Sequence, residues 1–362
     1  MANQQQISDF MPSAPSFNMN QQELYPPTLY PPSLYPPSVD MMYQITTEQR
    51  KERQEKIIKE YEISEDIKDE LYCLEHPIIL VVDNSSSMQS KAVDNTTYSA
   101  NKDKLNSLTT NYASRTEIDK LLSENENGLK RTRWDEAKNM TELCINIYSS
   151  YNIFGLDVHF LNSFNSIKSL YNVNNFDIVK NYFEYGPNGS TPLYETLNTI
   201  KNISKYQNTQ IKSVVIITDG EPSDCDDAKL RTLIEEMIKN NFYITLVPCT
   251  SSKSVIDFYN KMDDLDHLDV VDDYVSEWLQ VKSVQGKDFM FSKDMYYLKI
   301  LGGSTNDKLD KLDESPNLSK KYNKIDKPTE ISNMSNSTCD HVLTPFTSDK
   351  NNRKNKHNCV LL

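Results

Sequence analysis

The 362-residue sequence lacks the features that mark several large classes of protein. No apolar run is long enough for a membrane-spanning helix, and the amino terminus has no charged-then-apolar signal pattern, so we expect synthesis in the cytosol. The 6 cysteines show neither close pairing nor Cys/His zinc spacing, which predicts mostly free thiols. The net charge of −13 argues against nucleic acid as the main partner, because such binding needs a basic surface.

A continuous apolar run at residues 78–82 is followed at once by oxygen-bearing side chains. Its mostly β-branched residues predict a strand that is buried on both faces, as at the centre of a parallel sheet. Asp83, Ser85 and Ser87 follow at alternate positions. Because ligands bind beyond the carboxyl ends of such strands, this turn is a candidate site for a hard cation, Mg²⁺ first and Ca²⁺ or Mn²⁺ second. Taken alone, the pattern also fits an ordinary solvated turn.

Two later stretches favour the metal-site interpretation. Residues 214–218 predict a second fully buried strand, which ends on Asp219 and turns at Gly220. Residues 189–192 predict a loop that leads into a helix, with Thr191 as the N-cap and Pro192 as the first helical residue.

At these positions the sequence resembles the von Willebrand factor A (VWA) family. The metal-ion-dependent adhesion site (MIDAS) of that family takes Asp-x-Ser-x-Ser from one loop, a Thr from a second loop and an Asp from a third. All of these positions match without substitution, namely Asp83, Ser85, Ser87, Thr191 and Asp219. The resemblance implies that these side chains hold one divalent cation, directly or through water. It also implies that the cation accepts an acidic side chain from a partner protein.

Apolar runs and helical periodicities alternate along the middle of the chain. This alternation predicts an α/β fold with a doubly wound, mostly parallel sheet and helices on both faces, flanked by disordered tails. His159 falls inside one predicted strand, which favours a core histidine over a metal ligand. We expect strands at residues 78–82, 157–161, 214–218, 242–247 and 267–271, and helices at residues 131–147, 176–185, 192–206, 226–240 and 254–265.

Composition divides the chain into five segments. Residues 1–43 predict a disordered Pro/Tyr-rich tail, and residues 44–74 predict a charged helical segment with Thr47 as a candidate cap. Residues 75–303 form the predicted VWA-like domain, whose polar residues 90–128 are expected to be an extended loop or insertion. The closing part of this domain resembles intracellular, copine-like members of the family. Residues 304–358 predict a disordered polar linker with a basic end, and residues 359–362 a lipidation signal.

The amino-terminal tail carries short motifs of the kind that trafficking adaptors bind. The repeats from Tyr25 to Leu29 and from Tyr30 to Leu34 resemble Tyr-Pro-x-x-Leu motifs bound by ALIX-type adaptors, while a third repeat ends on Val39. The stretch from Pro12 to Pro15 resembles the Pro-Thr/Ser-Ala-Pro motif bound by the ESCRT machinery. Proline-rich segments also serve as plain spacers, so the tail either recruits these adaptors or only separates other parts.

The stretch from Cys359 to Leu362 matches the signal for prenylation of the cysteine, and the final Leu favours geranylgeranyl. A prenyl chain together with a basic patch makes a stable anchor, so we expect the protein on the cytoplasmic face of the cell membrane or an endosome. The basic patch comprises Lys350, Arg353, Lys354 and Lys356 against Asp349.

Two classes of function fit the candidate site. One is a metal-dependent adaptor or scaffold that binds proteins, and the other is a metal-dependent hydrolase or ubiquitin-pathway component that uses the same oxygens. A phosphatase of the aspartyl-phosphate kind would have a second Asp where Ser85 stands, and a serine hydrolase would have a Gly-x-Ser-x-Gly motif. The sequence has neither, and it has no zinc spacing for a RING domain. We therefore expect a membrane-anchored adaptor and not an enzyme.

Overall fold

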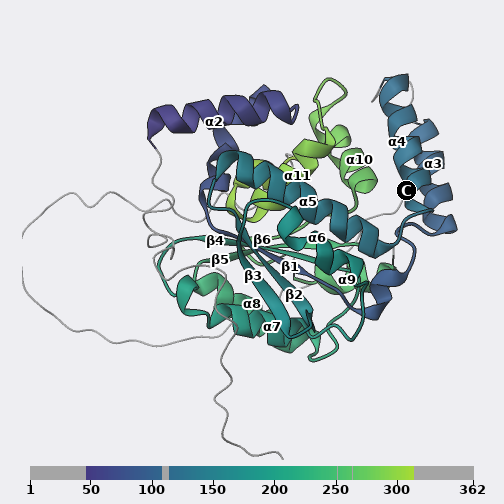
Figure 1. The fold of residues 1–362 in the computed structure, drawn as a ribbon. Coiled ribbons are helices and arrows are strands. Elements are labelled where there is room, and N and C mark those ends of the chain that lie inside the picture. The colour runs from purple at the N-terminus through teal and green to yellow at the C-terminus, as the bar shows by residue number, and fades with distance from the viewer. Residues whose placement is uncertain (1–45, 108–113, 251, 263, 314–362) are drawn as a thin grey trace, which may run out of the picture.

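A six-stranded sheet forms the centre of the structure, a computed structural model that describes residues 46–107, 114–250, 252–262 and 264–313 (Figure 1). The strand order is β3-β2-β1-β4-β5-β6, and every neighbouring pair is parallel except β2 and β3. The predicted α/β fold with a mostly parallel sheet is therefore confirmed. The strands are β1 (Ile78–Val82), β2 (Leu156–Phe164), β3 (Ile167–Val173), β4 (Lys212–Thr218), β5 (Phe242–Pro248) and β6 (Leu268–Val270).

The direction in which the chain adds strands reverses between β1 and β4. From β1 the chain proceeds to β2 and β3 on one side, and it then returns to β4 and continues to β5 and β6 on the other. Val82 of β1 pairs with Ile217 of β4, so the two strands end at the same level. Such a reversal opens a crevice at the carboxyl ends of the strands, where α/β proteins bind ligands.

Helices cover both faces of the sheet, as predicted. Alternate residues of β1 enter different cores, with Ile79 and Val81 on one face and Leu80 on the other. The apolar run is continuous because both faces are buried. One face packs against α2 (Thr47–Glu60), α5 (Arg133–Tyr151), α6 (Asp177–Glu184), α10 (Tyr274–Gln285) and α11 (Lys293–Gly302), and the other packs against α7 (Leu193–Lys201), α8 (Asp227–Lys239) and α9 (Lys253–Asn260).

The charged segment before β1 is helical and lies against the domain. It comprises α2 and the 3-10 helix η2 (Glu65–Glu75). Ile57 of α2 is fully buried, and the Arg53 guanidinium donates a 2.7 Å hydrogen bond to the Tyr151 carbonyl of α5. The N-cap is Thr46, which forms a capping box with Gln49, so the cap predicted at Thr47 is wrong by one residue.

The extended loop predicted at residues 90–128 is wrong. This stretch contains two helices, α3 (Asn95–Ser107) and α4 (Arg115–Gly128). The buried residues of α3 are Asn101 and Leu105, so its sequence has almost no apolar periodicity to reveal it. The α4 helix begins with a capping box of Ser114 and Glu117. This local helix-start signal was not used in the prediction, which rested on the polar composition of the stretch.

The folded domain also continues beyond the boundary predicted at residue 303. A 3-10 helix, η5 (Gly303–Thr305), leads into the short helix α12 (Asp307–Asp310). Leu309 and Leu312 are buried in the main core, and the Lys299 ammonium lies 3.2 Å from an Asp313 carboxylate oxygen. The Leu-Asp-Lys repetition in this stretch looks like part of a polar linker, but its leucines fill the domain.

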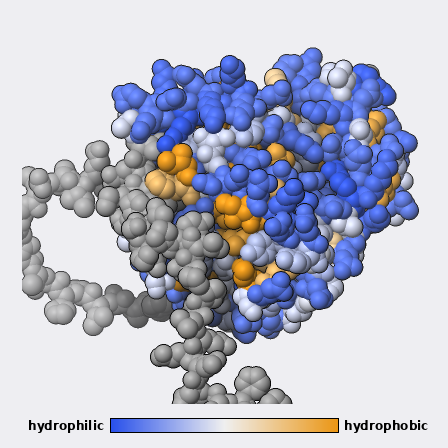
Figure 2. Space-filling model, in the orientation of Figure 1, coloured by the Kyte–Doolittle hydropathy of each residue, from blue (hydrophilic) through white to orange (hydrophobic). Residues whose placement is uncertain are grey.

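The surface drawn in Figure 2 is mostly hydrophilic, with a few hydrophobic patches. The exposed large apolar side chains include Ile167 and Tyr171 of β3. This edge strand was not predicted from the sequence.

The four cysteines within the described ranges are free thiols, as expected. Within those ranges, no helix combines the length and the apolar character that crossing a bilayer requires.

Candidate metal centre

The two candidate carboxylates meet because their strands are parallel neighbours. Asp83 follows β1 directly and Asp219 follows β4 directly. The Asp83 N–H donates a 2.8 Å hydrogen bond to the Ile217 carbonyl, which extends the strand pairing by one residue. Asp83 and Asp219 are 1% and 2% exposed. The sheet thus holds both carboxylates at its carboxyl edge, at the point where the strand order reverses.

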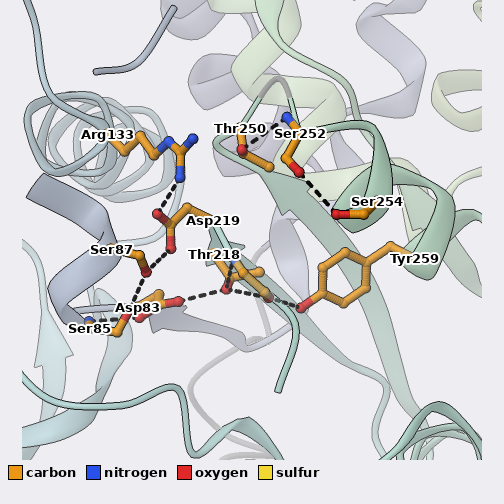
Figure 3. A network of polar contacts seen from close by, with 11 residues as sticks. Asp83, Ser85, Ser87, Arg133, Thr218, Asp219, Thr250, Ser252, Ser254 and Tyr259 are labelled. Carbon is orange, nitrogen blue, oxygen red and sulfur yellow. Dashed lines mark hydrogen bonds and ion pairs between the residues drawn. The ribbon is translucent and has the colours of Figure 1, made fainter. Parts of the chain in front are cut away.

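A row of oxygen atoms joins the first loop to the second carboxylate (Figure 3). The Ser87 hydroxyl donates a 2.7 Å hydrogen bond to Asp219 Oδ1, and the Ser85 and Ser87 hydroxyl oxygens are 2.9 Å apart. Because Ser87 gives its single proton to Asp219, the proton between the two serines belongs to Ser85. Ser85 and Asp219 are buried whereas Ser87 between them is exposed, so the row is open to solvent at its middle.

The Asp83 carboxylate is anchored from two sides. Its Oδ1 accepts a 2.8 Å hydrogen bond from the Ser85 N–H, and its Oδ2 accepts one of 2.7 Å from the Thr218 hydroxyl. Burial raises the pKa of Asp83 above its ordinary value, the two hydrogen bonds oppose this rise, and the neighbouring Asp219 charge adds to it. A cation near both carboxylates would relieve their repulsion.

Thr191 lies at the site but does not cap the next helix. The N-cap of α7 is Pro192, and the Tyr194 and Glu195 N–H groups donate to the Asp224 carboxylate, so the predicted capping role of Thr191 is wrong. The Thr191 hydroxyl oxygen would be 3.8 Å from a Cβ placed on Gly220, next to Asp219. Since its hydroxyl forms no hydrogen bond with the described residues, it is free to serve a ligand.

The loop that carries Thr191 is tied to the loop that carries the serines. The Ser86 N–H donates a 3.0 Å hydrogen bond to the Gly189 carbonyl, and the Gly189 N–H donates one of 3.1 Å to the Ser86 hydroxyl. Gly189 has φ +102°, and a Cβ there would lie 2.8 Å from the Asn162 side chain, so glycine is required. Asn162 in turn is hydrogen-bonded to Asn84. The five predicted residues are thus brought to one place by connected loops.

Arg133 is a charged neighbour that the sequence did not point to. It is the first residue of α5, and its guanidinium Nη1 donates a 2.7 Å hydrogen bond to Asp219 Oδ2. The Arg133 N–H also donates to the Ser90 carbonyl, which fixes the start of α5 beside the first loop. Asp219 therefore meets a hydroxyl at one oxygen and a cation at the other. No short-range signal in the sequence pairs these two residues, which are 86 positions apart.

The donor set fits a small, hard cation. A Mg²⁺ ion with bonds of 2.0–2.1 Å places neighbouring ligand oxygens about 2.9 Å apart, whereas the longer bonds of Ca²⁺ require about 3.4 Å. The spacings of 2.9 and 2.7 Å along Ser85, Ser87 and Asp219 are ordinary O–H···O hydrogen-bond lengths, so the preference for Mg²⁺ rests on the hard oxygen donors and not on these distances. In the described part of the chain no three His, Cys, Asp or Glu side chains converge, so soft or carboxylate-rich metal sites are not indicated there. A magnesium ion that keeps several waters suits the oxygens present.

The other residues singled out in the sequence were not predicted to be part of this site. His159 is a core residue as predicted, hydrogen-bonded to Ser169 and Tyr206, and burial lowers its pKa to about 4. The lipidation and adaptor-motif positions lie outside the described residues; they are Cys359, Pro12, Pro15, Tyr25, Leu29, Tyr30 and Leu34.

Comparison with protein-family models finds no match, and comparison with curated proteins finds none either. Among solved structures, the chain is similar to the VWA domain of SpRpn10 seen in its crystal structure. The two share 14% sequence identity over 60% of this chain and 99% of that chain, with a TM-score of 0.37. The α/β assignment rests on the strand order and the two helical layers rather than on this similarity.

Proposed function

We propose that the chain is a membrane-anchored adaptor of the VWA type that binds proteins through a Mg²⁺ ion. The ion is held by Asp83, Ser85, Ser87, Thr191 and Asp219, directly or through water, with Mn²⁺ or Ca²⁺ as substitutes. The observation that supports this best is the convergence of hard oxygen donors at the carboxyl edge of the sheet, where Ser85, Ser87 and Asp219 are joined by hydrogen bonds.

The ion adds a positive charge beside the two buried carboxylates, of which Asp219 is already paired with Arg133. Ser87 is exposed while both aspartates are buried, so the outward side of the site is the side open to a partner. An acidic side chain from a partner protein completes the coordination there. The hydrolase or ubiquitin-pathway alternative would need a proton-transferring base as well. Among the described residues, no histidine is hydrogen-bonded to the site, which favours the adaptor.

The metal proposal is tested by calorimetric titration of the full-length protein with Mg²⁺. Asp219→Asn removes one charge from the site but keeps its shape, so Mg²⁺ affinity should fall by at least about tenfold. Partners that a chelator releases from the wild type should fail to bind this variant even with Mg²⁺ present.

Glu221→Gln is the matched control, because Glu221 is an exposed carboxylate two positions further along the same loop. It should bind Mg²⁺ as the wild type does. Equal affinity in the wild type and in Asp219→Asn would refute the site.

Two further parts of the proposal concern residues outside the described ranges. Prenylation of Cys359 would place the domain at the cytoplasmic face of a membrane, and the motifs at Pro12, Tyr25 and Tyr30 would recruit ESCRT and ALIX-type adaptors. Both stay predictions from sequence motifs.

A further inference from the structure

A cavity of about 330 Å³ lies beside α5, and none of the five metal-site residues lines it. Its walls come from the α3 and α4 pair, from α5, from the end of β5, and from the starts of α10 and α11. Cavities of this size bind small organic molecules. The α3 and α4 wall is the stretch that the sequence alone suggested to be a loop.

Two hydrogen-bond acceptors that face this cavity have no protein partner. Asn125 is 2% exposed; its amide nitrogen donates a 2.9 Å hydrogen bond to the Tyr98 carbonyl, but its Oδ1 accepts none within the described residues. Glu136 is only partly buried, and its carboxylate forms no hydrogen bond or ion pair with any described residue. A buried acceptor without a donor, such as Asn125 Oδ1, is costly and is usually satisfied by water or a ligand.

Most of the remaining charged groups of the cavity have partners. Arg131 and Lys293 both bind Glu124, at 3.2 and 2.7 Å. Asp273 caps α10 by accepting from the Val275 and Ser276 N–H groups. Counting Glu142, the lining has four carboxylates against two cations. The unneutralised charge therefore belongs to acidic groups, and among the described residues neither Glu136 nor Glu142 forms an ion pair or a hydrogen bond.

We infer that this cavity binds a small organic amine, whose cationic nitrogen contacts the Glu136 carboxylate and Asn125 Oδ1. The apolar body of the amine lies against Val93, Met140 and Tyr297, which line the same cavity. One more group completes the fit: the buried Nε–H of Arg131 has no acceptor among the described residues, so it offers a donor to an oxygen on the ligand. An amine with an aromatic or aliphatic body and one hydroxyl matches all of these features.

The protonation state of Glu136 makes the affinity of the cavity for an amine depend on pH. Burial raises the pKa of Glu136 to about 7, and the Asp273 charge adds to this rise, whereas Arg131 and Lys293 oppose it. Because an amine prefers the ionised carboxylate, its affinity should increase as pH rises through 7 and should level off above.

The inference is tested on the full-length protein with three matched probes of nearly equal size: 2-phenylethylamine, 2-phenylethanol and 3-phenylpropanoate. Binding is measured by calorimetry at pH 8, where the Glu136 carboxylate is mostly ionised. The amine should bind at least tenfold more tightly than the alcohol, and the anion should bind most weakly. Glu136→Gln should remove the preference for the amine, whereas Glu136→Asp should retain part of it. Thermal unfolding of each variant verifies that the fold is intact.

Glu142→Gln is the comparison variant, because Glu142 lines the same cavity from α5 and, like Glu136, has no ion pair among the described residues. It should change the affinity for the amine by less than twofold. The inference fails if the anion binds as tightly as the amine, because Arg131 and Lys293 would then govern the site. It also fails if no probe binds at millimolar concentration, or if Glu136→Gln leaves the order of the three probes unchanged. None of these outcomes depends on the metal proposal, which has its own titration.

Discussion

Arg133 and the proposed metal ion compete for the same carboxylate. The Arg133 guanidinium lies 2.7 Å from one oxygen of Asp219, whose side chain is fully buried, so the negative charge is already balanced by the protein. A divalent ion that binds at the other oxygen meets a fixed positive charge only a few ångströms away, where water screens poorly. This arrangement predicts a weakened metal site, one that a partner's carboxylate strengthens.

Removing the Arg133 charge should therefore tighten metal binding. We expect Arg133→Gln to raise Mg²⁺ affinity about tenfold, equivalent to about 1.4 kcal/mol, in a calorimetric titration. Arg131→Gln serves as the control, because Arg131 binds Glu124 rather than a metal-site residue. Unchanged or weaker Mg²⁺ binding by Arg133→Gln would show instead that the guanidinium supports the site.

Among the secondary-structure elements, the buried strands were the easiest to predict. The β-branched runs of β1, β4 and β5 are continuous because helices cover both faces of the sheet, and the site residues stand directly after two of these strands. Asp83 and Asp219 were therefore placed correctly by chain position alone. The same logic fails for elements that do not cross the core. The strand β3 lies at the sheet edge with its residues partly exposed, and α3 buries only Asn101 and Leu105.

The residues missed at the site share one property, which is that their partners are distant in the sequence. Asp224 caps α7 from a loop 30 residues away, and this frees Thr191 from the capping role that its local sequence suggested. Arg133 reaches Asp219 across 86 residues. Local patterns report propensity and capping, whereas these contacts depend on how the loops meet after the sheet has formed.

The helix α12 provides a test of where the domain ends. Leu309 is fully buried in the main core although it stands in a stretch that reads as a polar linker. We expect Leu309→Ala to lower the free energy of unfolding by about 2–4 kcal/mol, measured by chemical denaturation, because it leaves a cavity. Asp307→Ala is the control in the same helix, since its ion pair with Lys311 is exposed and should contribute less than about 0.5 kcal/mol. If Leu309→Ala were as stable as the wild type, α12 would not be part of the folded domain.

On the scale of the whole molecule, the proposed functions are spread over three parts of the chain. The metal site lies at the carboxyl edge of the sheet, and the amine cavity lies on the α5 side, with walls from the α3 and α4 pair. The adaptor motifs and the lipidation signal lie in the segments before and after the described domain. An adaptor with this organisation would join a membrane, a metal-dependent partner and trafficking proteins. Each of these proposed functions can be tested by its own mutations.

The proposed lipid anchor would determine where the other parts act. If Leu362 is the carboxyl terminus in the cell, the sequence from Cys359 to Leu362 is a substrate for geranylgeranyl transfer, and the thioether forms at the Cys359 sulfur. A single prenyl chain binds membranes only marginally, but basic residues near an anionic surface add about 1 kcal/mol each, and four precede Cys359 within ten positions.

Cys359→Ser should move the protein from the membrane to the soluble fraction and remove the isoprenoid mass from its carboxyl-terminal peptide. Cys339→Ser, which changes another cysteine outside the described residues, should do neither. Replacing Lys354 and Lys356 together should keep the isoprenoid but make membrane binding more sensitive to salt. Equal membrane association of Cys359→Ser and the wild type would place the anchor elsewhere in the chain.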